Sequence, residues 1–174
     1  MWWSSLSARL RTLLTLAVLA VLLLAGVAWG WSQVTEPFPG KVDPAICVDT
    51  SYAAGEELFV QDVTVSVLNA SSREGLAGRT LADLEDVGFA GGQTANAPKG
   101  TVVSTPAEIW VSDPDNPGAK LLRQHVGKVP IRSDVTSPAA GITLVVGDTF
   151  GDLIDGPTSV VLDADAVVCS PPVE

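Results

Sequence analysis

The sequence predicts an α+β domain, a sandwich of one mixed sheet with two helices on one face, preceded by one transmembrane helix. Three observations indicate this fold class: an uncharged apolar run near the N-terminus, a strand-and-helix pattern from Val63 to Phe89, and a second helical stretch between short apolar runs further on. The elements expected after residue 62 follow the order β-α-β-β-α-β-β, which is typical of a sheet that buries one face under helices.

The N-terminal run predicts a membrane anchor. No charged residue lies in Thr12–Thr35, and the apolar stretch Leu13–Trp31 is long enough to cross a hydrocarbon core of about 30 Å as a helix. Arg9 and Arg11 precede the run, so the positive-inside rule places the N-terminus in the cytoplasm and the chain beyond the run outside it. A cleaved signal sequence is the alternative, but the run exceeds the usual apolar length of about 7–15 residues.

This topology divides the chain into parts that we expect to differ in role. The parts are a cytoplasmic N-terminus at residues 1–11, a transmembrane signal anchor at 12–33, an extracytoplasmic tether and loop at 34–62, and a folded domain with an acidic C-terminal extension at 63–170. The tether, Ser32–Pro44, is rich in proline and glycine, and the loop Asp49–Gln61 that follows it is expected to add an edge strand at Leu58–Val60.

Charge excludes one class of ligand. Of the ten basic residues, two precede the apolar run, so eight stand against twenty acidic residues in the part beyond it. This surplus of twelve negative charges repels nucleic acids and other polyanions at long range unless a local basic patch overrides it. The basic residues are scattered along the sequence, so we expect no nucleic-acid partner.

The two cysteines are expected to form a disulfide. Cys47 lies near the start of the exported part and Cys169 near its end, and outside the cytoplasm such a pair is normally oxidised. Redox catalysis is the alternative, but redox-active pairs usually lie close together in sequence, as in C-x-x-C.

The stretch from Val63 to Phe89 has the clearest local pattern. Alternating valines predict a strand with one buried face, and apolar residues at three- and four-residue intervals then predict a helix that ends at Gly88. Ser71 and Glu74 have the spacing of a capping box, which places the helix start near Ser72.

The second half continues the same kind of pattern. Ala107–Val111 predicts a strand, Asn116 and Pro117 predict a capped helix start, and the continuous apolar run Ile142–Val146 predicts a central strand. Gly127 is expected to end the second helix, and a short strand is expected at Val129–Ile131.

Several motifs carry a resemblance to a known family. The run V-x-V-L-N-A-S, the later G-L-A-x-x-T-L-A-x-L with G-F, and the terminal V-V-G-D-x-F resemble, in order and spacing, the LytR C-terminal domain family over about Val63–Phe150. The single anchor and the flanking cysteines are most similar to its bacterial single-pass cell-envelope integrity proteins. The resemblance implies an envelope-facing, non-enzymatic role without a cofactor, and a wall component or envelope protein as partner.

A few residues are candidates for catalytic or binding sites. Asp148 and Asp152 are the acid pair of an alternative function, a secreted hydrolase of wall glycan, and the acidic tail is a candidate metal site. The turn at Asn69, Ser71 and Ser72 is the candidate ligand site, because amides at a helix start bind anions. Two further patterns have structural interpretations: Asp113-x-Asp115 as a turn and not a calcium loop, and His125 as a helix-end residue.

Overall fold

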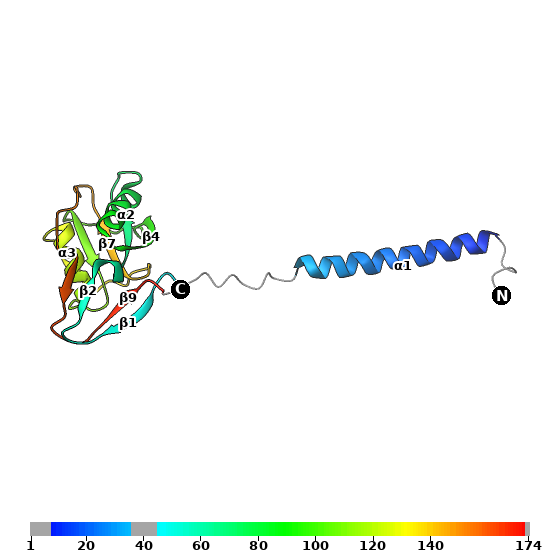
Figure 1. Cartoon of the computed structure of the whole chain (residues 1–174). Helices are drawn as coiled ribbons and strands as arrows, with labels where there is room; N and C mark the ends of the chain where they lie inside the picture. Colours follow the sequence, from blue (N-terminus) through cyan, green and yellow to red (C-terminus); the bar gives the residue numbers. More distant parts are fainter. Residues whose placement is uncertain (1–7, 36–44, 173–174) are drawn as a thin grey trace. The chain divides into compact units, whose positions relative to one another are not determined.

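A computed structural model describes residues 8–35 and 45–172, with side chains in the first segment described for 12–27 and 29 (Figure 1). The chain divides into two units, the first of which contains helix α1 (Ala8–Thr35). The sequence predicts a membrane span at residues 12–33. In the part of the chain that the structure describes, no helix combines the length and the hydropathy that a membrane span requires.

The second unit is built on a mixed five-stranded sheet. Its strands run in the spatial order β4-β3-β7-β5-β6, with the bounds β3 (Thr64–Asn69), β4 (Ala90–Asn96), β5 (Ala107–Trp110), β6 (Ile131–Arg132) and β7 (Ile142–Val146). Strand β3 is parallel to both of its neighbours, whereas β5 is antiparallel to β7 and parallel to β6. With helices α2 (Leu76–Val87) and α3 (Pro117–Val126), the chain order from β3 to β7 confirms the predicted β-α-β-β-α-β-β sequence of elements.

Both helices contribute to one core against the same face of the sheet. Leu84 of α2 and Leu122 of α3 are fully buried and share one hydrophobic cluster with Val65, Ile109 and Leu144 from three adjacent strands. These strand residues alternate with others whose side chains face the opposite side, so the helices cover a single face. This arrangement is the layer order predicted from the apolar stripes.

The opposite face of β3 is also buried, which corrects the predicted strand with one buried face. Leu68, Trp110 and Val145 form a second, smaller cluster there. The hydroxyl of Ser66 donates to the carbonyl oxygen of Ala140 at 2.7 Å. The alternation of valine with threonine and serine fails as a signal because both hydroxyl residues are buried as well: Ser66 has hydrogen-bond partners, whereas the hydroxyl of Thr64 has none among the described residues.

Helix α2 begins later than predicted. Its N-cap is Gly75, with φ of 69°, and no side chain caps the helix, so the capping box expected at Ser71 and Glu74 is wrong. The hydroxyl of Ser71 instead accepts from the amide of Arg73 at 3.1 Å, within a turn that precedes the helix. The predicted end at Gly88, which has φ of 113°, is confirmed.

Helix α3 begins and ends as predicted. The side chain of Asn116 accepts from the amide of Ala119 at 3.2 Å, Pro117 takes the first turn, and Gly127 follows the last one. The side chain of Asp113 accepts from the amide of Asp115 at 2.9 Å, so this segment is an Asx turn that leads into the helix.

Residues before and after the sheet pair with each other. Two antiparallel ribbons, β1–β9 and β2–β8, are formed by β1 (Val48–Tyr52), β2 (Glu57–Phe59), β8 (Ser159–Val161) and β9 (Ala166–Ser170). The 3-10 helix η1 (Val60–Asp62) follows β2. Residues 48–52 were expected in a loop, and this expectation is wrong because their pairing partners lie more than 100 residues away, where no local pattern can show them.

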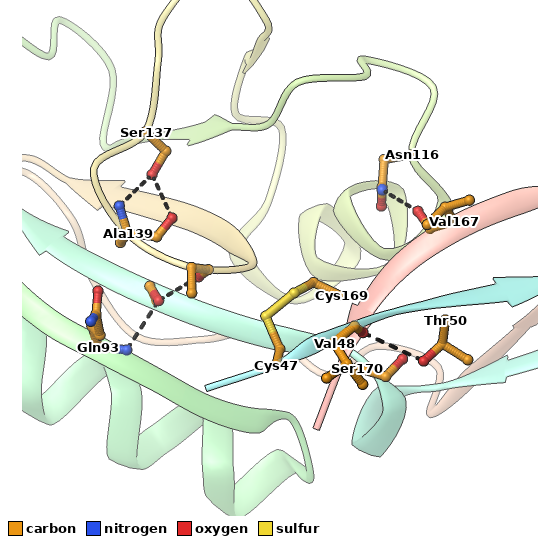
Figure 2. Close-up of a disulfide and its surroundings, with 12 residues drawn as sticks. Cys47, Val48, Thr50, Gln93, Asn116, Ser137, Ala139, Val167, Cys169 and Ser170 are labelled. Atoms are coloured by element: carbon orange, nitrogen blue, oxygen red, sulfur yellow. Dashed lines mark hydrogen bonds between the residues drawn. A yellow bond between two sulfur atoms is a disulfide. The ribbon is translucent and has the colours of Figure 1, made fainter. Parts of the chain in front are cut away.

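A disulfide closes the β1–β9 ribbon. Cys47, just before β1, is bonded to Cys169 in β9, with their Cα atoms 5.3 Å apart at a sequence separation of 122. Figure 2 shows this bond beside the start of α3, where Asn116 donates to the carbonyl oxygen of Val167 at 3.2 Å. The predicted pairing of the cysteines is confirmed, and it fixes the C-terminal strand to the start of the folded unit.

Candidate functional site

The turn predicted to bind a ligand is built around the side chain of Asn69. Its carbonyl oxygen accepts from the amide of Ser71 at 2.9 Å and from the hydroxyl of the same residue at 2.6 Å. Its amide group donates to the carbonyl oxygen of Arg73 at 2.7 Å. These bonds explain the turn without a ligand, because they satisfy the polar groups that follow the end of β3.

The remaining donors of this turn bind an internal carboxylate. Both the amide and the hydroxyl of Ser72 donate to Asp148, at 2.8 and 2.9 Å. The backbone bond from Ser72, followed by its hydroxyl bond, lowers the pKa of Asp148 below its ordinary value. The anion at the predicted site is therefore a side chain of the same domain, which links the turn after β3 to the segment after β7.

Asp148 is poorly suited to the acid role in glycan hydrolysis. A general acid must hold a proton near neutral pH, which requires a raised pKa, whereas the pKa of Asp148 is lowered. The other predicted member of the pair, Asp152, is exposed. Among the described residues, no three or more histidine, cysteine, aspartate or glutamate side chains are grouped so that they could hold a metal ion.

His125 lies in the last turn of α3, as predicted for a helix-end residue, but its side chain belongs to the core and not to a polar neighbourhood. The side chain is 1% exposed, and its ring packs edge-on against Phe89 with centroids 5.3 Å apart. Nε2 donates to the carbonyl oxygen of Pro157 at 2.9 Å, and Nδ1 has no hydrogen-bond partner among the described residues. The sequence signal was available, because His125 lies three and four positions after the buried Leu122 and Leu121.

A groove of about 1180 Å³ lies between the β1–β9 ribbon and the end of β5. We call it the acidic groove, because its lining includes four carboxylates and, within the part of the chain that the structure describes, neither lysine nor arginine. The carboxylates are Asp49, Glu56, Asp113 and Asp165, and hydroxyl groups of serine, threonine and tyrosine lie between them. Such a lining favours neutral or cationic ligands that can donate hydrogen bonds.

The ribbon wall of the acidic groove is held by bonds to distant parts of the chain. Asp165 accepts from the amide of Ala54 at 2.9 Å, and Asn116 ties β9 to the start of α3. Cys169 itself lines the groove, so the disulfide is part of this wall. On the sheet side, Trp110 is 3% exposed and its indole N–H donates to Glu108 at 3.1 Å, which fixes the ring in place.

Sequence reasoning did not find this groove. Asp49 and Asp165 lie more than 100 positions apart, and each resembles an ordinary surface acid in its own stretch. The cysteines were the only local sign that the two ends of the domain meet. The predicted turn residues, by contrast, lie together as expected but outside the groove.

These features define a class of protein: a disulfide-closed α+β domain with a polar surface groove. The family described as "LytR cell envelope-related transcriptional attenuator" (LytR_C) matches residues 62–150, about half of the chain, and the chain therefore belongs to this family. The match contains the sheet and both of its helices. The ribbon wall of the acidic groove lies outside it.

Two proteins of known name or structure are similar to the chain. The "Cell wall biosynthesis protein LcpA" of Corynebacterium glutamicum is 32% identical over 111 residues, which cover 64% of this chain and 20% of LcpA. The chain thus matches only about a fifth of the length of that relative. The crystal structure of the soluble domain of a conserved hypothetical secreted protein from Mycobacterium marinum aligns with a TM-score of 0.49 and 22% identity, over 60% of this chain and 79% of that one.

Proposed function

We propose that the protein is a membrane-anchored, extracytoplasmic, non-catalytic module that helps to maintain bacterial cell-envelope integrity by binding a wall component or a partner protein. Membership of a cell-envelope-related family supports the setting. The relative named for cell wall biosynthesis supports a role close to the wall. The acidic groove is the observation that carries the binding role.

The chemistry of the acidic groove favours a wall component over an anionic polymer. Its carboxylates and hydroxyl groups accept hydrogen bonds from sugar hydroxyls and from amino groups, both of which are abundant in wall glycans and their peptides. Four carboxylates, with no lysine or arginine among the described lining residues, disfavour phosphate-rich or nucleic-acid ligands. The β1–β9 ribbon, which forms one wall of the acidic groove, lies outside the residues that match the family. We therefore expect the ligand preference of the groove to be particular to this chain and its near relatives.

Two further features support the proposed location. A disulfide between Cys47 and Cys169 is stable in an oxidising compartment and rare in the cytosol. The uncharged run Thr12–Thr35, preceded by Arg9 and Arg11, supports an uncleaved anchor with the domain outside. The mass of the protein extracted from membranes tests this, since cleavage at the small residues Gly26–Ala28 would remove the N-terminus and most of the apolar run.

Binding to the wall can be tested with a charge reversal in the acidic groove. Asp49 is exposed and makes no side-chain bond within the described residues, so Asp49→Lys should leave the fold intact. The full chain in a nonionic detergent is expected to sediment with purified insoluble cell wall, and Asp49→Lys is expected to remain in the supernatant. Asp163→Lys is the matched control, because it makes the same charge change outside the groove. Equal sedimentation of all three proteins would contradict the proposal.

A further inference from the structure

The basic residues of the domain are not equivalent once their partners are considered. Most of those that the structure describes are engaged: Arg73 donates to a backbone carbonyl at 2.6 Å, Arg79 donates to another at 3.1 Å, Lys120 pairs with Asp115, and Arg132 pairs with Asp134 and Glu108. Lys99, Arg123 and Lys128 have no side-chain partner within the described residues. Among the described side chains of the domain, these three are therefore the basic groups with neither an ion pair nor a hydrogen bond.

Two of these three line the same surface depression. Arg123 and Lys128 lie around the C-terminal end of α3 and, together with Lys120, line a groove of about 970 Å³ that we call the basic groove. The side-chain amide of Gln124 adds hydrogen-bonding capacity, and Asp155 is the one carboxylate in the lining. A local surplus of positive charge thus exists on a domain whose total charge is strongly negative.

The other wall of the basic groove is apolar and fixed. It is formed by Val129, Pro130, Ile154 and Pro157, and Ile154 remains 52% exposed. Two hydrogen bonds to His125 hold this wall. The amide of Ile154 donates to the carbonyl oxygen of His125 at 2.8 Å, and Nε2 of His125 donates to the carbonyl oxygen of Pro157. The groove therefore presents free cations beside an exposed apolar surface on a segment anchored to the core.

We propose that the basic groove binds the phosphate group of a phosphate ester whose organic part lies on the Ile154 wall. Arg123 offers the planar donor pair that matches phosphate oxygens, and Lys128 adds a point charge that needs no fixed geometry. A phosphate with no organic part would leave the apolar wall uncovered, so the ester is the better fit. This site lies outside the acidic groove and does not depend on the function proposed for it.

Three soluble probes test the site and identify the source of the phosphate. The full chain in a nonionic detergent is titrated with glycerol 3-phosphate, dihexanoyl phosphatidylglycerol and dihexanoyl phosphatidylcholine, while amide NMR shifts near Arg123 and Lys128 are followed. We expect shifts with at least one of the two net-negative probes and weaker shifts with the zwitterionic lipid. A response to glycerol 3-phosphate alone indicates a water-soluble ester, and a response to the phosphatidylglycerol alone indicates a lipid headgroup. No saturable response to either would overturn the proposal.

Variants decide whether the response comes from this groove. Arg123→Gln with Lys128→Gln is expected to weaken binding about tenfold or more, and added salt is expected to weaken it in the wild type. Lys99→Gln is the control, because Lys99 is also unpartnered but lies outside the groove. Asp155→Asn is expected to strengthen binding, because it removes a negative charge from the lining, and weaker binding of the phosphate probes would contradict the proposal. Asp49→Lys is expected to leave phosphate binding unchanged, which separates this site from the acidic groove.

Discussion

Replacing Cys47 and Cys169 together by serine is expected to remove a large part of the stability of the domain. The disulfide closes a loop with a sequence separation of 122 residues. On the chain-entropy model a loop of that length stabilises the folded state by about 4.9 kcal/mol, because it restricts the unfolded chain. Domains of this size have a total stability of about 5–15 kcal/mol, so the loss is comparable to the whole at the lower end.

Urea unfolding measures this loss directly. The indole N–H signal of Trp110 reports the folded state, since it donates to Glu108 in the interior. With an m-value of about 2 kcal/mol per molar urea, the midpoint of the serine variant is expected to fall by about 2 M or more. The wild type in a reducing agent is the control and should show a similar loss. A midpoint within about 0.3 M of the oxidised wild type would refute the argument, because it would mean that the bond constrains neither state.

Three further substitutions test single contacts. Asp148→Asn should loosen the turn at Ser72 and lower the stability of the domain. The pKa of Asp148 is lowered in the folded state, so the wild type should keep its full stability advantage at pH values above the ordinary pKa of 3.8. This advantage should vanish as the pH falls through the lower pKa of the folded state. Gly156→Ala should destabilise the domain by about 1–3 kcal/mol in thermal melts, since its Cβ would lie 2.9 Å from the His125 ring. Asn116→Ala should cost about 1–2 kcal/mol in urea unfolding, through the lost cap of α3 and the lost bond to β9.

Each of these substitutions has a matched control. Asp152→Asn removes a neighbouring exposed carboxylate, and its stability should depend on pH as that of the wild type does. If the wild type instead became more stable relative to Asp148→Asn as the pH fell, the assigned direction of the pKa shift would be contradicted. Gly151→Ala adds a methyl group where no atom lies within 4 Å, so only the change at position 156 should lower the melting temperature. Asn116→Asp keeps the cap oxygen but not the donor, and stability equal to that of the alanine variant would show that the cap contributes nothing.

The sheet and its helices could be predicted because their signals are local. The alternating valines of β3, the apolar run Ile142–Val146 and the cap at Asn116 each lie within a few residues of the element they define. The start of α2 was missed for a physical reason. Asn69 and Asp148 take up the polar groups of the turn, so Ser71 has no helix amide to cap.

The grooves could not be predicted because they depend on pairings across the whole domain. Strand β1 pairs with β9, and the register joins Val48 to Ser170. Asp49 becomes part of a groove only through this register, and its own neighbours in sequence give no sign of it. The free charges of Arg123 and Lys128 became visible only when the partners of the other basic residues were known.

The central claim is that the acidic groove contacts the cell wall, and photo-crosslinking in intact cells tests it most directly. A photoreactive amino acid at Ser133, an exposed residue in the groove lining, is expected to give adducts that carry wall sugars or wall peptides in mass spectra. The same amino acid at Val102, which is 79% exposed and outside the groove, is expected to give none. Wall adducts of equal yield at both positions, or none at Ser133, would contradict the account.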